Sequence, residues 1–193
     1  MTFEELVKTN RSYRKYGQQK RIGREKLLSW IDLARNTPST ANLQPFKFFI
    51  STEDDLNEKI FKLTAWARNL KNYNGPLEGE KPTAYVVLCF DKRVSENPDR
   101  FGIDAGIIGQ TLLLKAREDG FGGIFIKSFK KPELSEIVGK GEYLEPYVVI
   151  ALGDPNEKII LEDATENGGI AYYRDEENVH HVPKRTLDEL IIN

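Results

Sequence analysis

Residues 103–118 read Ile-Asp-Ala-Gly-Ile-Ile-Gly-Gln-Thr-Leu-Leu-Leu-Lys-Ala-Arg-Glu, the longest strongly helical stretch of the chain. Small residues gather on one side of this helix (Ala105, Gly106 and Gly109), and the leucines of 112–114 extend its apolar surface. Because that surface is too wide for one side of a small domain, we expect the helix to be buried all round. Glycine costs about 1 kcal/mol in a helix interior relative to alanine. The two glycines therefore indicate close approach of another backbone or a flat ligand, or else tight helix packing.

Several segments around this helix have the patterns of strands. Residues 84–90 form a continuous, β-rich apolar run that predicts a central strand, and 46–51 and 147–152 predict two more. Residues 120–126 read as a glycine-rich turn that enters a further strand. The spacing of apolar residues predicts other helices at 2–9, at 54–70, at 132–138, at 187–191 and from Arg24, with Leu27, Leu28, Ile31 and Leu33 or Ala34 on one face. This order of elements indicates an α+β sandwich with few strands.

The composition changes after Lys158. Residues 163–178 are polar and contain glycine, and they show no helical period. We expect them to form an arm that lies on another surface, such as a partner subunit. Residues 179–182 predict a last short strand or turn.

The bulk properties limit the class of protein. A length of 193 residues fits one domain with a trailing arm, and a net charge of -2 provides no strong field for nucleic acid or an anionic membrane. The single cysteine, Cys89, lies in an apolar run and is predicted to be a buried packing residue. The first residues lack a basic region followed by an apolar one, and no apolar run approaches the roughly 20 residues that span a bilayer. We therefore expect a cytoplasmic protein.

Two basic clusters stand far apart in the sequence. Arg11, Ser12 and Arg14 could together hold one phosphomonoester, because arginine offers a planar fork of donors and serine adds a hydroxyl; the alternative is an ordinary basic surface loop. Lys184 and Arg185 matter only if they converge with that loop. The neighbouring pair at 180–181, His-His, has no acid or cysteine at metal spacing and is expected on a surface strand.

Residues 37–46 (Thr-Pro-Ser-Thr-Ala-Asn-Leu-Gln-Pro-Phe) are a run of short polar side chains between two prolines. Ser39, Asn42 and Gln44 could present donors and acceptors to a flat heterocycle. The alternative is a helix-ending loop with local side-chain bonds. A second candidate is the pair Gly122 and Gly123, which could let backbone amides approach a ligand edge or could simply form a tight turn.

Taken together, these segments resemble the FMN-dependent nitroreductase family. The matching stretches appear in the family's order and cover essentially the whole chain. They are residues 10–16 (Asn-Arg-Ser-Tyr-Arg-Lys-Tyr), 37–46, 104–110 (Asp-Ala-Gly-Ile-Ile-Gly-Gln) with the leucines at 112–114, 120–123 (Gly-Phe-Gly-Gly), 149–155 (Val-Ile-Ala-Leu-Gly-Asp-Pro) and 183–185 (Pro-Lys-Arg).

The resemblance implies an architecture and a set of cofactor-binding residues. It implies one domain over residues 1–193, with a central, mostly antiparallel sheet flanked by helices and an arm from about 159. The protein would be an intertwined homodimer with two FMN sites at the interface. By the same resemblance, Arg11, Ser12, Arg14, Lys184 and Arg185 would hold the FMN phosphate and nearby polar atoms. Pro38, Ser39, Asn42 and Gln44 would lie along the isoalloxazine, often from the other subunit, and Gly122 and Gly123 would approach its far edge.

The resemblance also implies an activity. NAD(P)H would reduce FMN, and FMN would then reduce a small nitroaromatic or quinone-like acceptor at the same open face, in a ping-pong pattern. Reductive dehalogenation and flavin breakdown are other reactions of the fold, and an FMN-binding module without turnover is a non-enzymatic alternative. The basic loop could instead bind a nucleotide without flavin. The residues show no catalytic triad, metal site or paired carboxylates.

The chain departs from the family's pattern at three places. Asn10 stands where the basic loop commonly begins with arginine, and Lys127 stands where many members carry glutamate. A lysine there would make the flavin's surroundings more positive if its side chain points that way. The segment between Phe90 and Phe101 is short, so the substrate lid is expected elsewhere, at residues 66–77.

Overall fold

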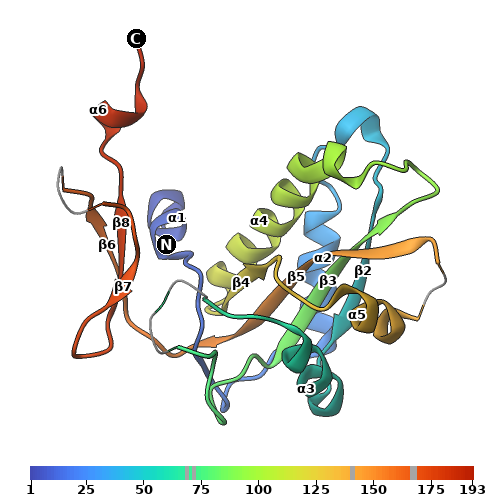
Figure 1. Cartoon of the computed structure of the whole chain (residues 1–193), viewed down its shortest axis with the longest axis horizontal. Helices are drawn as coiled ribbons and strands as arrows, with labels where there is room; N and C mark the ends of the chain where they lie inside the picture. Colours follow the sequence, from blue (N-terminus) through green and yellow to red (C-terminus); the bar gives the residue numbers. More distant parts are fainter. Residues whose placement is uncertain (68–69, 71–72, 140–141, 166–168) are drawn as a thin grey trace.

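The computed structural model describes residues 1–67, 70, 73–139, 142–165 and 169–193. Within those residues, one sheet has five strands, all paired antiparallel. Helices cover both of its faces (Figure 1). The strands of this sheet are β1 (Tyr16–Gly17), β2 (Phe46–Ser51), β3 (Ala84–Asp91), β4 (Gly122–Ile126) and β5 (Leu144–Pro155). The α+β class and the mostly antiparallel sheet are therefore confirmed.

The long strand β5 organises the sheet. It pairs with β3 along one side, and β3 in turn pairs with β2. Along its other side β5 pairs with β4, and the end of β5 pairs with β1. Because β3 lies between two strands and every one of its residues is buried, the prediction of a central strand at 84–90 is confirmed.

The alternation of side chains along β3 creates two cores. Val86, Leu88 and Phe90 point to one face, where they pack with helices α2 (Arg24–Ala34) and α4 (Gly102–Glu118). Tyr85, Val87 and Cys89 point to the other face, towards α3 (Asp54–Leu63) and α5 (Lys131–Val138). Cys89 is buried as predicted, and burial raises the pKa of its thiol. The fold is thus three layers, with the sheet in the middle.

The central helix α4 is not buried all round in a single chain, so that prediction is wrong for one subunit. Its inner face is covered, but Ile103 is 76% exposed. Gly106 and Gln110 are exposed on the same side of the helix. The two glycines differ in purpose: a Cβ on Gly109 would lie 2.2 Å from the Phe125 ring, whereas one on Gly106 would meet nothing within 4 Å. Gly109 therefore serves tight packing, and Gly106 belongs to an open face.

Two other helix predictions need correction. Leu27 and Ala34 of α2 are buried as expected, with Ala34 rather than its alternative Leu33 on the packed face. Leu28 was expected there too but is exposed, and Trp30 is buried instead. The helix expected at 54–70 ends at Leu63, because Thr64 turns into an extended bridge with Phe129. Residues 68, 69, 71 and 72 of that helix and of the expected lid lie outside the described residues.

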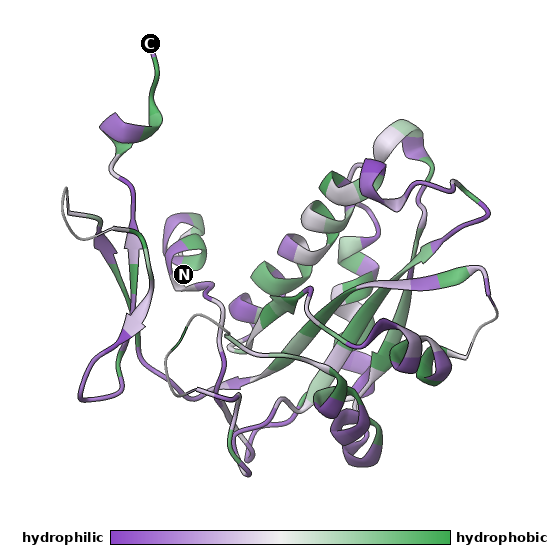
Figure 2. Cartoon of the chain, viewed as in Figure 1, coloured by the Kyte–Doolittle hydropathy of each residue, from purple (hydrophilic) through white to green (hydrophobic). Residues whose placement is uncertain are grey.

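The arm after Lys158 has more regular structure than its polarity predicts. Its strands are β6 (Ile159–Asp163), β7 (Tyr173–Arg174) and β8 (His180–Lys184), and β6 runs parallel to β8. This small sheet stands beside α1 (Phe3–Thr9), apart from the main sheet (Figure 1). The short helix α6 (Leu187–Leu190) and the chain end project further out, and the last residues are apolar (Figure 2). Two 3₁₀ turns complete the chain, η1 (Thr40–Asn42) and η2 (Pro98–Phe101).

Candidate functional site

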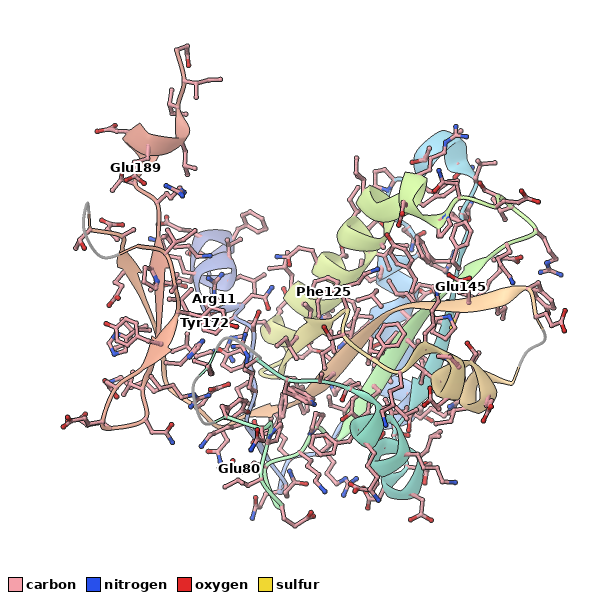
Figure 3. All side chains as sticks on the ribbon, in the orientation of Figure 1. Arg11, Glu80, Phe125, Glu145, Tyr172 and Glu189 are labelled. Carbon is pink, nitrogen blue, oxygen red and sulfur yellow. The ribbon has the colours of Figure 1, made fainter. Side chains whose placement is uncertain are left out.

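Two adjoining pockets lie where the arm meets the main body. The basic pocket, of about 320 Å³, lies between α1 and the arm sheet; Figure 3 labels Arg11 and Tyr172 side by side there. The strand-edge pocket, of about 210 Å³, runs along β4. The two pockets share Arg14 and Tyr172, so together they form one elongated site. The basic pocket is lined by Asn10, Arg11, Ser12, Arg14, Ile159, Tyr172, His180, Val182 and Lys184. The strand-edge pocket is lined by Arg14, Ala65, Trp66, Ala67, Ile124, Phe125, Ile126, Lys127, Ser128 and Tyr172.

A larger cavity of about 590 Å³ lies elsewhere, beside α3. Its charged side chains largely neutralise one another: Arg21 pairs with Asp54, and Lys81 bridges Glu58 and Glu78. The basic pocket, by contrast, gathers cationic side chains whose donors are not all used. We therefore take the two adjoining pockets as the candidate site, although they are smaller.

Arg14 is the central side chain of the site. It is only 8% exposed, and its Nη1 donates to the Ser12 carbonyl at 3.0 Å and lies 3.3 Å from His180 Nε2. Its Nε is buried with no hydrogen-bond partner among the described residues. A buried guanidinium N–H without an acceptor is costly, and an anion in the basic pocket would satisfy it.

His180 was missed by the sequence analysis, and its expected position on a surface is wrong. The side chain is 1% exposed, and burial together with the nearby Arg14 and Arg174 lowers its pKa to about 4. The ring is therefore neutral at pH 7. Because the always-protonated Arg14 faces Nε2, the ring proton is assigned to Nδ1, which is buried and unpartnered among the described residues. His180 is thus an unused donor beside the basic pocket.

The remaining basic residues converge only in part. Arg11 donates to the carbonyls of Asn10 (2.7 Å) and Val7 (2.8 Å) at the end of α1 and so lines the pocket from that helix. Lys184, at the end of β8, lines the same pocket. Of the second basic pair, Lys184 therefore does converge with the loop that carries Arg11 and Arg14. Arg185 does not line it; this side chain is exposed and its nearest acid is Glu189, at 3.7 Å.

The edge of β4 forms the wall of the second pocket. Ser12 forms a bridge with Gly123, and the Tyr13 N–H donates to the Gly123 carbonyl at 3.1 Å, so this carbonyl points away from β5, at the edge of the sheet. Because backbone groups alternate along a strand, the N–H and C=O of Phe125 point the same way. The free edge of β4 can therefore hydrogen-bond a flat polar ligand.

The glycine pair at the start of β4 is required by packing. A Cβ on Gly122 would lie 2.4 Å from the Tyr13 ring, and one on Gly123 would lie 2.4 Å from the Ala151 carbonyl. These contacts let the basic loop lie directly on the strand. Close packing accounts for both glycines, a reason that neither the ligand-edge nor the tight-turn alternative named, and its effect on the site is to bring Ser12 against β4.

Lys127 points partly away from the strand edge. Its Nζ donates to the Tyr147 carbonyl at 2.9 Å and lies 3.5 Å from the centre of the Tyr147 ring. Burial lowers the pKa of this ammonium group, which lies between the strand-edge pocket and an apolar hollow of about 390 Å³ against α4. Lys127 therefore adds positive charge beside the site.

The loop at 37–46 lies at the other end of α4, away from both pockets (Figure 1). The exposed Pro38 precedes Ser39, whose hydroxyl donates to Asp104 at 2.6 Å. Thr40 donates to Asp104 twice, through its backbone N–H at 2.9 Å and its hydroxyl at 2.6 Å. Asp104 is 2% exposed, and it was given no role in the sequence analysis, although it is the one acid in the apolar first half of α4.

Asp104 fixes an unusual backbone. Ala41, Asn42 and Gln44 all have positive φ angles (49°, 54° and 48°), a region that costs side-chain-bearing residues on the order of 1 kcal/mol or more each. Asn42 and Gln44 are exposed, and their side chains bond each other at 3.0 Å. Such strain concentrates at functional sites. The loop is held in a defined shape that presents polar groups to the exterior of this chain.

The comparisons with known proteins agree with this architecture. The model of the family described as "Nitroreductase family" matches residues 7–154, which is more than half of the chain.

The chain belongs to the nitroreductase family.

Individual relatives of this nitroreductase-family chain support the assignment. A protein of Methanothermobacter thermautotrophicus, provisionally named an NADH dehydrogenase/NAD(P)H nitroreductase, is 27% identical over 79% of this chain and 77% of its own length. The crystal structure of a nitroreductase family protein from Clostridium difficile 630 has a TM-score of 0.64 at 25% identity, over 81% of this chain and 86% of that one. A provisionally named nitroreductase from Exiguobacterium sibiricum 255-15, solved in complex with FMN, has the same fold, with a TM-score of 0.67 at 20% identity over 81% of this chain and 90% of that one.

The described residues include no group of three or more histidine, cysteine, aspartate or glutamate side chains arranged to hold a metal ion. No helix in the same residues combines the length and apolar character needed to cross a membrane.

Proposed function

We propose that this nitroreductase-family chain is an FMN-dependent oxidoreductase in which NAD(P)H drives the reduction of small nitroaromatic or quinone-like acceptors. The observation that carries the proposal is the elongated site, in which a pocket with unused cationic donors opens through Arg14 onto the free edge of β4. A ligand with a phosphate at one end and a flat heterocycle at the other matches a site with a cationic pocket at one end and a strand edge at the other. The relatives named as NAD(P)H nitroreductases give the reaction class.

The residues present fit the FMN phosphate. Arg11, Arg14 and Lys184 supply positive charge, and Ser12 supplies a hydroxyl. The buried Nε of Arg14 lacks an acceptor, which is what a bound phosphate oxygen provides. His180 would add a neutral N–H from Nδ1. Asn10 contributes no charge where the family commonly has arginine, so the positive charge of the pocket would come from Arg11, Arg14 and Lys184.

The flat part of the cofactor would lie along β4. Bound FMN would supply the redox chemistry, taking a hydride from the nicotinamide and passing electrons to the acceptor. Phe125 and its neighbours in β4 would orient the ring through backbone groups on the free edge. The Lys127 ammonium, next to the same pocket, would favour negative charge there.

We further propose a homodimer. No described residue of the same chain covers the open face of α4, which begins at Ile103. The apolar residues of the tail are also uncovered there, and Ile192 is 99% exposed. Burial of apolar area at a subunit interface would remove both from water. Pro38, Ser39, Asn42 and Gln44 would then reach the isoalloxazine of the partner's site, because their loop lies at the open end of α4, far from their own chain's pockets.

The proposed activity predicts a bleachable flavin. The purified protein is expected to carry FMN, and anaerobic addition of NADH or NADPH should bleach the flavin absorption band. A nitroaromatic compound or a quinone should then restore it. Bleaching by dithionite but by neither nicotinamide would refute the reductase proposal in favour of an FMN-binding module. A protein that takes up no FMN would refute the cofactor assignment itself.

The proposed dimer predicts a mass near twice 22.1 kDa in sedimentation at low micromolar concentration. Introducing charge on the open face of α4, as in the double variant Ile103→Glu and Ile107→Glu, should shift the protein to monomers, because carboxylates are costly to bury at an interface. Leu77→Glu is a matched control, since Leu77 is also exposed but lies in the loop before β3. A wild-type monomer with native circular dichroism would contradict the shared-site arrangement.

A further inference from the structure

We propose that Tyr172, carried by the arm, is the cover of the cofactor site and the residue that stacks on the flavin ring at the end that carries the ribityl phosphate. The proposal rests on the proposed function. Among the described residues, Arg14 and Tyr172 alone line both the basic pocket and the strand-edge pocket. A ligand that spans the two pockets must therefore pass against these two side chains.

The surroundings of Tyr172 form an aromatic and cationic stack. The Arg14 guanidinium lies 5.2 Å from the centre of the Tyr172 ring. The His180 ring lies on the same tyrosine, at 5.4 Å between centroids and a tilt of 57°. Arg14 and His180 each have a buried nitrogen at the basic pocket with no hydrogen-bond partner among the described residues. Tyr172 thus touches the proposed phosphate-binding groups on one side and the strand-edge pocket on the other.

The backbone that carries Tyr172 is anchored immediately after it. Arg174 pairs with Glu157, which is almost fully buried and whose other oxygen accepts the Arg14 backbone N–H. Tyr173 stacks on His181, at 4.7 Å and nearly parallel. His181 is bonded to Glu162 and Asp175, which closes the arm sheet around it.

Tyr172 itself is held less firmly than these neighbours. Within the described part of the chain, its hydroxyl makes no hydrogen bond, and the side chain is half-buried. A half-buried ring on an anchored backbone can change rotamer without disturbing the arm. That combination suits a cover, which must stay in place while the ligand is bound and move aside when the ligand enters or leaves.

Tyr172 supplies the cover that the short segment before α4 does not. The sequence placed the lid at residues 66–77, of which Trp66 and Ala67 do line the strand-edge pocket. Tyr172 closes the same pocket from the arm. The site would therefore be enclosed by two segments that are more than one hundred residues apart in the sequence.

The test compares two adjacent tyrosines. FMN is titrated into the apoprotein of five proteins, and binding is measured by the quenching of flavin fluorescence. The five are wild type, Tyr172→Ala, Tyr172→Leu, Tyr172→Phe and Tyr173→Ala. Since stacking of a heterocycle on an aromatic side chain contributes on the order of 1–3 kcal/mol, Tyr172→Ala and Tyr172→Leu should raise the Kd by about tenfold and leave bound FMN more fluorescent. Tyr172→Phe should resemble wild type. Tyr173→Ala removes an adjacent ring that lines neither pocket, and its Kd should stay within about twofold.

Inorganic phosphate serves as a second probe, because it fills only the basic pocket. The Kd of inorganic phosphate, obtained from its competition with FMN, should be the same in wild type and Tyr172→Ala. If Tyr172→Ala and Tyr172→Leu bind FMN as tightly as wild type, with the same quenching, the cover is refuted while the cofactor proposal stands. Equal weakening by Tyr173→Ala would also refute it, because the effect would then belong to the arm as a whole. Failure of wild-type apoprotein to bind FMN would overturn the proposed function, and the cover with it.

Discussion

Replacing Arg14 by alanine should weaken FMN binding by roughly ten- to a hundredfold, which corresponds to the loss of about 1.5–3 kcal/mol from one charge-assisted hydrogen bond. The physical reason is the position of the guanidinium. It is buried where the basic pocket and the strand-edge pocket join, and its Nε has no other acceptor among the described residues. Titration of apoprotein with FMN measures the change.

Two further variants sharpen this test. Arg14→Lys keeps the charge but loses the planar fork, and we expect it to recover only part of the affinity. Arg185→Ala is the matched control, because Arg185 is exposed, lies outside the pocket and faces Glu189. An Arg185→Ala variant that loses as much affinity as Arg14→Ala would show that phosphate binding depends on general charge, against the assignment of Arg14.

Replacing Asp104 by alanine should lower the free energy of unfolding by about 2–4 kcal/mol, since it leaves three donors from Ser39 and Thr40 without their buried acceptor. The loop with three positive φ angles would lose the contact that holds it. Urea unfolding measures the change in stability, and proteolytic cleavage within residues 37–46 measures the loosening of the loop. Glu118→Ala, at the exposed end of the same helix, should change stability by no more than about 0.5 kcal/mol.

The stabilisation by Asp104 should also depend on pH. Burial works to raise the pKa of Asp104, but the hydrogen bonds from Ser39 and Thr40 outweigh it and lower the pKa below the usual value. The folded state therefore binds this proton less well than the unfolded state. Its contribution is complete above about pH 4 and is lost as the pH falls through the lowered pKa. The stability difference between wild type and Asp104→Ala should shrink in that acidic range, and a difference that stays constant down to pH 2 would contradict the assignment.

Local patterns predicted the layers of the fold better than the surroundings of individual side chains. The apolar run of β3 and the helical spacing of α4 and α5 need only short-range information, because secondary structure responds to periodicity. The same information failed at the outer face of α4, where the sequence shows an apolar surface and cannot say which molecule covers it. It failed again in the arm, because β6, β7 and β8 pair across a polar segment whose composition indicates a loop.

In the candidate site, too, some residues could be predicted from local sequence and others could not. Arg11, Ser12 and Arg14 are neighbours in sequence, and the resemblance to a family was enough to connect them with Lys184. The burial of His180 and the acceptor role of Asp104 carried no comparable signal, since a histidine in a short strand and an acid near a helix start are both common at surfaces.

The sequence by itself determined most helices and strands of the main body, the central position of β3 and the family, because these follow from the order and spacing of residue types along the chain. Only the tertiary structure decided that Arg14 meets His180 across 166 positions, that Tyr172 joins two pockets and that Arg185 stays outside. The physical reason is that the energy of a buried polar group depends on its partners and its distance from water. Those are set by the packing of distant segments, and no local pattern of residues contains them.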